Sequence, residues 1–406
     1  MFYLFRKKYR IFIIFLIACS FILSNEDNAG LSYSSKNKNA FWIKNNNYGL
    51  KNSSHISYQK HVHLNQKIYI NLDLYYISGN FHISETYLKY KVDKDSYFKI
   101  GKYYRDFSSY LNDELSSGSM LISPNASPMP KASYISKFSP RFNPMIEFKF
   151  GISHGQFDQN LNYDDPPFLH EKFLYFNYKL PQNIFQIGIV HEAIWGGTTH
   201  LGKQPATFED YFRIFRASHG SESAILMDQV NALGNHLGIW DFAYIYENKN
   251  RMKFYYQHFF EDDSGFKFKN QYDGLWGIEF SNGTSNFLIE HLNTTSRSGN
   301  SNSFGNDNYY YHENYLEGWS YKEFVLGNAL IFINDSKPLD ITHLGISHKI
   351  NDFELAFLLT EKTYFSKTNL FLLKINKFID NKIFEIKIGN DVENNLSLIS
   401  GIQITF

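Results

Sequence analysis

Hydrophobic and polar positions alternate in short runs along most of the chain from about residue 55 onward. The clearest run is Ile68–Leu74, where four aliphatic side chains occupy every second position and Tyr69, Asn71 and Asp73 fall between them. Successive side chains of a strand point to opposite faces, so this pattern predicts strands with one apolar and one polar face. The run Phe384–Ile388 alternates in the same way near the other end of the chain.

About 18 such runs follow one another, most of them roughly 8 to 13 residues long, close to the ~9–11 residues of a tilted membrane-spanning strand. They begin near residues 55, 66, 81, 96, 131, 145, 170, 183, 235, 251, 272, 285, 320, 340, 353, 367, 381 and 395. No convincing amphipathic helix interrupts them. A sheet within a membrane cannot leave an unpaired edge. We therefore predict an all-β fold, a transmembrane antiparallel β-barrel over residues 55–406 with about 18 strands, in a range of about 16–20.

The connections between the runs differ in length. Short ones cover residues 181–183, 247–250 and 281–284, and long ones cover 104–130, 156–169, 195–234 and 295–319. Short periplasmic turns and long extracellular loops are typical of outer-membrane barrels. Counting strands from the C-terminus and from the middle places 295–319 on opposite sides of the membrane. We therefore expect missed strands, one around Asn308–Tyr315 and another before residue 55.

The last residues give the sharpest single signal. Apolar residues alternate with polar or small ones up to the terminal residue, at Leu396, Leu398, Ile402, Ile404 and Phe406. A final strand that ends in Phe resembles the signal read by the outer-membrane barrel insertion machinery. We therefore expect this machinery to be a partner that recognises Phe406.

The first residues are typical of an export signal. Basic residues at positions 6, 7, 8 and 10 precede an apolar stretch over 11–23, which is shorter than the roughly 20 residues of a spanning helix. We predict a signal peptide over 1–24, a short periplasmic segment over 25–54 and the barrel over 55–406. Residues 16–19 also fit a lipobox, so lipidation of Cys19 is an alternative. Cys19 is the single cysteine, which excludes a disulfide framework.

Composition agrees with a barrel and excludes other classes. Lys+Arg and Asp+Glu both number 40, so the chain lacks the basic character of a nucleic-acid binder. Aromatic residues make up 18% of the chain, and a barrel can place them on its lipid face and in its interface girdles. The mean hydropathy of −0.37 argues against a bundle of transmembrane helices.

Three short motifs could carry chemistry, and each has an ordinary interpretation. His61 and His63 share one face of a strand, but a catalytic zinc site needs a third ligand. The segment Ser218–Glu222 supplies a hydroxyl, an imidazole and a carboxylate for an outer-membrane lipid hydrolase, but it lies in a long polar loop. The acidic pairs at 164–165 and 262–263 could supply oxygen ligands to calcium, but no spaced loop motif accompanies them and such pairs are typical of turns at strand ends. We expect no metal, no cofactor and no enzymatic activity.

One long segment is not typical of a generic barrel loop. After Gly101-Lys102, a serine-rich apolar run over 115–123 leads into Pro124-Asn-Ala-Ser-Pro-Met-Pro130. This segment resembles the Wzi capsule assembly family, and later segments agree in order and spacing. The positions that carry the resemblance include Ser119, Asn125, Pro128, Pro130, Trp195, Gly196, Asp262 and Trp276.

The resemblance covers about 95–380 and implies a location and a function. It implies an outer-membrane barrel of a Gram-negative bacterium whose long loops, here 104–130 and 195–234, fold toward the lumen and close the pore. It implies a non-enzymatic protein that binds capsular or exopolysaccharide, with membrane lipid as the other partner. The candidate polysaccharide-binding residues are Arg105, Asp113, Asn125, Trp195, Arg213, Arg216 and His219.

Alternatives to this interpretation remain. The function could instead be that of a porin or transporter for small or apolar solutes, or of a lipid hydrolase. Trp195, Trp240 and Trp276 could belong to the interface girdle rather than to a sugar site.

Overall fold

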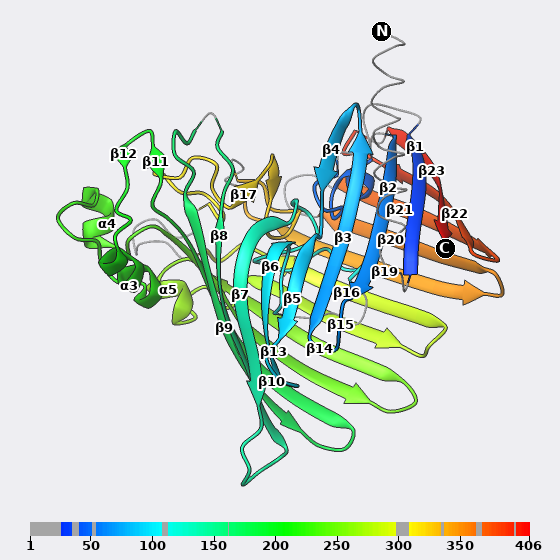
Figure 1. Ribbon diagram of the computed structural model, residues 1–406, viewed down its shortest axis with the longest axis horizontal. Coiled ribbons are helices and arrows are strands. Elements are labelled where there is room, and N and C mark those ends of the chain that lie inside the picture. Colours follow the sequence, from blue (N-terminus) through cyan, green and yellow to red (C-terminus); the bar gives the residue numbers. More distant parts are fainter. Residues whose placement is uncertain are drawn as a thin grey trace.

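The computed structural model describes residues 26–34, 40–50, 54–107, 113–160, 162–297, 308–333, 337–362, 368–393 and 395–406. The predicted signal peptide and Cys19 lie outside these residues. One antiparallel sheet dominates the described part (Figure 1). Its strands are β1 (Glu26–Ser34), β2 (His55–His63), β3 (Ile68–Ile77), β4 (Asn80–Ile83), β5 (Tyr87–Lys91), β6 (Ser96–Tyr103), β7 (Met129–Phe138), β8 (Ile146–Gln156), β9 (Phe168–Lys179), β10 (Asn183–Trp195), β13 (Asn235–Glu247), β14 (Arg251–Phe260), β15 (Gly274–Ser281), β16 (Ser285–Asn293), β19 (Asp340–Ile350), β20 (Phe353–Lys362), β21 (Thr368–Ile379), β22 (Lys382–Asn390) and β23 (Leu396–Thr405).

The sheet closes on itself because β1 pairs with both β2 and β23. At this seam Asn28 lies opposite Thr405 and Ser34 lies opposite Ile399. Strands β4 and β5 both pair with β3, one after the other, and so share one position in the wall. The described residues thus form a closed antiparallel barrel of 18 strands, which confirms the predicted fold class.

The two ends of the barrel differ in their connections. At the short-turn end, strands are joined by residues 64–67, 180–182, 248–250 and 282–284. At the long-loop end, they are joined by 104–128, 157–167, 196–234, 261–273 and 294–339. The start of β1 and the end of β23 both lie at the short-turn end. In Figure 1 the turns that follow β13 and β15 lie toward the lower right, and the helices of the long loops lie toward the left.

Two strand predictions are wrong, and together they explain the conflict over 295–319. The run at 320 is a hairpin of β17 (Ser320–Tyr321) and β18 (Phe324–Val325) within the connection 294–339. Its apolar side chains pack into the barrel interior instead of facing lipid, and Trp319 beside it is fully buried. No strand forms over the described residues 308–315. Without these two runs, 294–339 is a single long-loop connection.

The structure differs from the predicted periplasmic segment over 25–54. Residues Glu26–Ser34 are strand β1, which was expected only as a missed strand before residue 55. Residues 40–50 lie inside the barrel and contain the short helix α2 (Phe41–Lys44), whose Phe41, Trp42 and Ile43 are buried. The reason is that β1 supplies the strand that closes the barrel, and residues 40–50 pack against the plug inside it.

Side chains alternate between the lumen and the outer face, as the period-2 pattern predicts. Across β9, β10 and β13, the outward row Leu174, Ile189 and Trp240 is followed toward the short-turn end by Phe176, Ile187 and Phe242. The next row is Tyr178, Phe185 and Tyr244. These rows form the apolar and aromatic outer band expected of a membrane barrel.

The helices of the described residues are short and lie in the long-loop connections. Besides α2, they are α3 (Phe208–Arg216), α4 (Leu226–Val230) and α5 (Asp263–Phe266). A second small hairpin, β11 (Thr198–Thr199) with β12 (Gly202–Lys203), precedes α3. Within the described ranges, no helix has both the length and the apolar character needed to cross a membrane.

Candidate functional site

The lumen is filled by three chain segments, residues 113–128, 40–50 and 308–333, which we call the plug. Almost every residue from Leu115 to Ala126 is buried, and Ser117, Ser119, Met120 and Leu121 have no exposed surface. These segments form one hydrophobic cluster with inward-facing residues of the barrel wall. The serine-rich apolar run of the sequence is therefore interior chain, which confirms that the 104–130 connection folds toward the lumen.

Polar side chains of the wall hold the backbone of the plug. On β16, Glu290 accepts hydrogen bonds from Ser116 Oγ at 2.7 Å and from the Ser117 backbone N–H at 2.7 Å. On β14, Gln257 accepts one from the Met120 N–H at 3.0 Å. Buried backbone groups need partners because water cannot reach them. The wall thus supplies acceptors where the irregular plug backbone has donors.

The 308–333 segment donates hydrogen bonds to backbone carbonyls of residues 113–128. Trp319 donates its indole N–H to the Leu121 carbonyl at 2.6 Å, and Asn328 donates its amide to the Gly118 carbonyl at 2.8 Å. Gly318 has a φ of +56°, and a Cβ there would lie 2.1 Å from the Tyr310 carbonyl oxygen. Only glycine fits this close approach without a backbone shift.

Residues 40–50 form the third layer of the plug. Trp42 donates its indole N–H to Thr360 Oγ1 on β20 at 2.9 Å. The Asn46 side chain donates to the Ser116 and Ser117 carbonyls at 3.2 and 3.0 Å. Burial, together with the nearby Tyr104 and acidic groups, raises the pKa of Tyr48. Its phenol therefore stays neutral within the plug.

The structure places Arg105, Asp113 and Asn125 within or beside the plug. Arg105 is buried, pairs with Asp113 at 3.0 Å and donates to the Ile122 carbonyl at 2.8 Å. Asn125 is buried and donates to the Val325 carbonyl at 2.9 Å. These bonds fix the plug and leave Arg105 and Asn125 little surface for an external ligand.

The remaining candidate residues lie elsewhere. Trp195 faces outward from β10 and packs against Phe168 and Tyr211. Arg213 pairs with Glu209 at 2.6 Å and Asp210 at 3.0 Å within α3, whereas Arg216 is exposed. His219 is exposed and hydrogen-bonds the Asn231 carbonyl at 3.0 Å. The structure therefore does not gather the seven candidates into one site.

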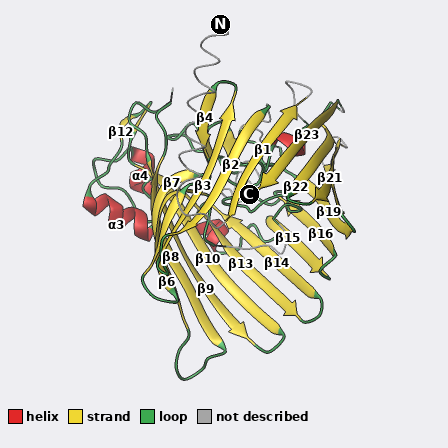
Figure 2. Ribbon diagram, turned by 45° about the vertical axis from the view of Figure 1, so that its right-hand side comes forward, coloured by secondary structure: helices red, strands yellow, loops and turns green. Residues whose placement is uncertain are grey.

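The connection 196–234 differs from the expectation that it folds into the lumen. Its first part contacts the plug, since Asn314 bonds Thr199 Oγ1 at 2.6 Å and Gln204 at 2.9 Å. Its helical part, α3 and α4, lies against the outer side of the wall (Figure 2). The physical reason is its apolar side chains, which have their partners on the outward face of β8–β10 and not in the filled lumen.

The other motif positions have structural partners. Ser119 Oγ accepts the Leu121 N–H at 3.4 Å, and the Gly196 carbonyl accepts the Tyr315 hydroxyl at 3.2 Å. Asp262 caps α5 by accepting the Gly265 N–H at 2.7 Å. Pro128 is buried at the end of the plug, and Pro130 lies in β7 opposite Lys102. Trp276 faces outward and stacks on Tyr256 with ring centroids 3.7 Å apart, as a girdle residue would.

The motifs considered for chemistry do not assemble a reactive group in the structure. Ser218 Oγ donates to the Arg213 carbonyl and Ser221 Oγ bonds Ser223 Oγ, so neither hydroxyl engages His219. On β2, the His61 ring bonds the Tyr69 hydroxyl at 2.9 Å. Within the described ranges, no three His, Cys, Asp or Glu side chains are grouped so that they could hold a metal ion.

Comparison with known proteins identifies the family. The family model described as capsule assembly protein Wzi matches residues 24–334, more than half of the chain. The chain belongs to the Wzi capsule assembly family. Together with the closed barrel, this makes it an outer-membrane capsule-assembly protein, and the long-loop end is the external end.

Other comparisons add little. A search of curated proteins finds no match. Among solved structures, a mutant of the Rhodopseudomonas blastica porin is 8% identical, with a TM-score of 0.40, covering 94% of this chain and 98% of the porin. A triple mutant of the same porin is 7% identical, with the same TM-score and coverage.

Below the plug, this Wzi-family barrel has a cavity that the sequence did not reveal. It has a volume of about 630 Å³ and is lined at the short-turn end by β1–β3 and β19–β23. Its charged lining is balanced, with Glu114, Glu354 and Glu385 against Lys349, Lys374 and Lys387. Lys374 pairs with Glu114 of the plug at 2.9 Å and with Glu385 at 3.5 Å. The plug thus closes the external side of this polar cavity.

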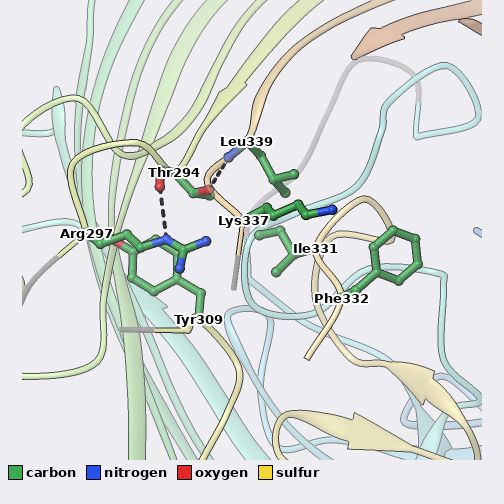
Figure 3. A pocket seen from close by; sticks show the side chains of 7 residues that line it. All are labelled: Thr294, Arg297, Tyr309, Ile331, Phe332, Lys337 and Leu339. Carbon is green, nitrogen blue, oxygen red and sulfur yellow. Dashed lines mark hydrogen bonds between the residues drawn. The ribbon is translucent and has the colours of Figure 1, made fainter. Parts of the chain in front are cut away.

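On the external side of the plug, a small hollow lies between Arg297, Tyr309, Phe332 and Lys337 (Figure 3). Its volume is about 10 Å³, enough for about one water molecule. Arg297 donates to the Thr294 carbonyl at 3.2 Å, and Thr294 Oγ1 accepts the Leu339 N–H at 2.8 Å. This hollow is too small to enclose a sugar ring.

Acid should loosen the external part of the plug around His312. Burial, and then the nearby His236, lower the pKa of His312 to about 4. An unfolded histidine titrates near 6.5, so between about pH 6.5 and 4 the opened loop binds a proton that the closed loop does not. The stability of the closed loop is therefore complete above pH 6.5. As the pH falls through this window, it is lost by up to about 1.4 kcal/mol per pH unit.

Amide exchange at Asn314 and Tyr315, whose N–H groups point at His312 Nδ1, measures this opening. Their protection should fall more steeply with acid in the parent than in a His312→Asn variant. Equal pH slopes in the two proteins would contradict the assignment.

Proposed function

We propose that this barrel holds capsular polysaccharide at the cell surface through its external loops, without catalysing a reaction. The observation that carries the proposal is the plug. An 18-stranded barrel could enclose an aqueous channel, but here the plug fills the lumen, and residues 113–128 are bonded to the wall on one side and to residues 308–333 on the other. A protein built this way is suited to binding at its external face rather than to passing solutes.

Two external loops form a joined surface, residues 157–160 with 162–165 and residues 311–323, which we call the external loop pair. Lys322 pairs with Asp158 at 2.9 Å, and Asn162 donates to Glu317. Beneath these polar links, the rings of Tyr163 and Tyr315 pack with centroids 6.3 Å apart. The pair is therefore a fixed surface, and residues 311–323 of it belong to the plug.

The external loop pair exposes the side-chain types that bind sugars. Tyr311 is an exposed aromatic ring, and Asn160, Asp164, Glu313 and Lys322 are exposed polar groups. Sugars stack on aromatic rings and hydrogen-bond to planar polar groups. This surface supports the proposal better than Arg105 or Asn125, which are buried in the plug.

Binding of the purified barrel to the cells' own polysaccharide tests the proposal. We expect the parent to retard the polymer in affinity electrophoresis. A Tyr311→Ala, Lys322→Ala double variant should weaken binding about tenfold or more, because it removes a stacking ring and a charged hydrogen-bond donor. Phe142→Ala is the matched control, since Phe142 is an exposed aromatic residue at the short-turn end. A parent that does not bind, with an unchanged capsule on gene deletion, would refute the proposal.

A further inference from the structure

Helices α3 and α4 expose an unusual amount of apolar surface for an external loop. Phe208 is 77% exposed, Leu226 is 79% exposed and Val230 is 72% exposed. Phe212, Phe215 and Met227 are also exposed. In α3, the aromatic residues lie at positions 208, 211, 212 and 215, which is the spacing of one helical face. Tyr211 and Phe215 turn toward the wall, whereas Phe208 and Phe212 of α3 and Leu226 and Val230 of α4 leave large apolar side chains exposed.

The contacts of α3 place it on the outer side of the wall. His154 on β8 and His170 on β9 lie opposite each other and face outward. Tyr211 of α3 bonds His154 at 3.1 Å, and its ring contacts His170 at a centroid distance of 5.6 Å. Lys172, also outward on β9, donates to the Phe215 carbonyl. Figures 1 and 2 both show α3 and α4 beside the barrel and outside its wall.

The strand register gives the depth of this contact. The outward rows that begin at Leu174, Phe176 and Tyr178 are apolar or aromatic across β9, β10 and β13. The step from His170 to Tyr178 is about 26 Å of strand at about 3.3 Å per residue. A tilt of about 35–45° reduces it to about 20 Å along the membrane normal, within the ~25 Å height of an apolar band. The row of His170 therefore lies at the external boundary of that band.

We propose that α3 and α4 form an interfacial element that inserts its apolar face among the acyl chains of the outer leaflet. The occupant is lipid because the exposed apolar face continues the lipid-facing rows of the same wall. Phe, Leu, Met and Val also lack the polar tips that a glycan-stacking surface would use. An amphipathic helix of this kind lies in the interface with its apolar face about 5–10 Å deep.

The polar groups of this element fit lipid headgroups. Glu209, Arg213 and Arg216 flank the exposed aromatic residues of α3, about 80–140° around the helix axis from Phe208. Lys172 holds the C-terminal end of α3 from below by its bond to Phe215. Cationic groups beside an inserted apolar face are attracted to the phosphates of anionic lipids. The element would thus anchor the external loops to the membrane surface next to the barrel.

Single-cysteine labelling can test the insertion directly. The chain has one cysteine, Cys19, in the predicted signal peptide, so an added cysteine is a unique label site in a barrel lacking that segment. Phe208→Cys and Val230→Cys would carry an environment-sensitive fluorophore in barrels reconstituted into phosphatidylethanolamine and phosphatidylglycerol vesicles. Glu209→Cys is the matched control, because its exposed side chain lies about 100° around the helix from Phe208 and pairs with Arg213.

We expect nitroxides on the lipid acyl chains to quench the labels at 208 and 230 several-fold more than the label at 209. Equal quenching at all three sites, or none, would overturn the proposal. Shielding of position 208 by added polysaccharide without lipid quenching would also overturn it and indicate a sugar-binding face. Shielding that grows with protein density would overturn it in favour of contact between two copies of the chain.

Discussion

Replacing residues 114–127 with a short Gly-Ser linker is expected to turn this barrel into a conducting pore. The deleted segment carries the bonds from the plug to Glu290 and Gln257 on the wall. It also carries the acceptors for Trp319 and Tyr310 of the 308–333 segment. Without it, the remaining layers lose their shared partner, and an 18-stranded wall is wide enough to hold an aqueous channel. Conductance per inserted molecule should rise by about tenfold or more.

Single-channel recording in planar bilayers measures this effect. The parent should give little or no stepwise current, and the deletion variant should give large steps that are linear with voltage. Replacing residues 218–224 with the same linker is the control, since that segment lies beside α3 and outside the lumen. A parent that already conducts as a large ohmic pore would contradict a closed lumen and favour the porin alternative.

The second large effect is expected at Glu290, whose carboxylate is almost completely buried. It accepts hydrogen bonds from Ser116, from the Ser117 N–H and from the Tyr255 hydroxyl at 2.7, 2.7 and 2.5 Å. Glu290→Ala leaves these buried donors without an acceptor, and each unsatisfied group costs about 1–3 kcal/mol. Local stability of the plug should therefore fall by about 3 kcal/mol or more.

Protease sensitivity of residues 113–128 and amide exchange at Ser117 report this loss in the folded barrel. Glu290→Gln is the control, since it keeps one acceptor oxygen at the same position and should lose much less. If Glu290→Ala protects the Ser117 amide as well as the parent does, the wall does not hold the plug in this way.

The strands of the wall were predictable because alternate residues of a membrane barrel face lipid and lumen, and their side chains differ accordingly. Ile68–Leu74 and Phe384–Ile388 lie in strands as expected, with alternating faces. The run at 320 misled because Trp319, Tyr321 and Phe324 are apolar for another reason, burial in the plug. Strand β1 was not recognised because its Asn, Gly and Ser residues give little alternation. The local pattern of apolar residues does not show whether those residues face lipid or pack against other parts of the protein.

The site was less predictable because its contacts join distant parts of the chain. Ser116 and Glu290 are 174 residues apart, and no local spacing reveals that they meet. Arg105 and Asn125 were chosen for their chemistry, but the same chemistry serves the plug backbone. Helix α3 did leave a local signal, since Thr207 and Asp210 form a capping box before its aromatic residues. We predicted no amphipathic helix, and that prediction was wrong.

The pairing of β1 with β23 also sets the order of assembly. Asn28 and Thr405, which bond each other across the seam, are 377 residues apart. Bringing such distant ends together costs about 5 kcal/mol of free energy, because the chain loses conformational entropy before the bonds across the seam form. Long-range strand pairing is slow for this reason. The wall therefore seals last, between the first and final strands, and until then both carry unpaired edges that a lipid environment penalises.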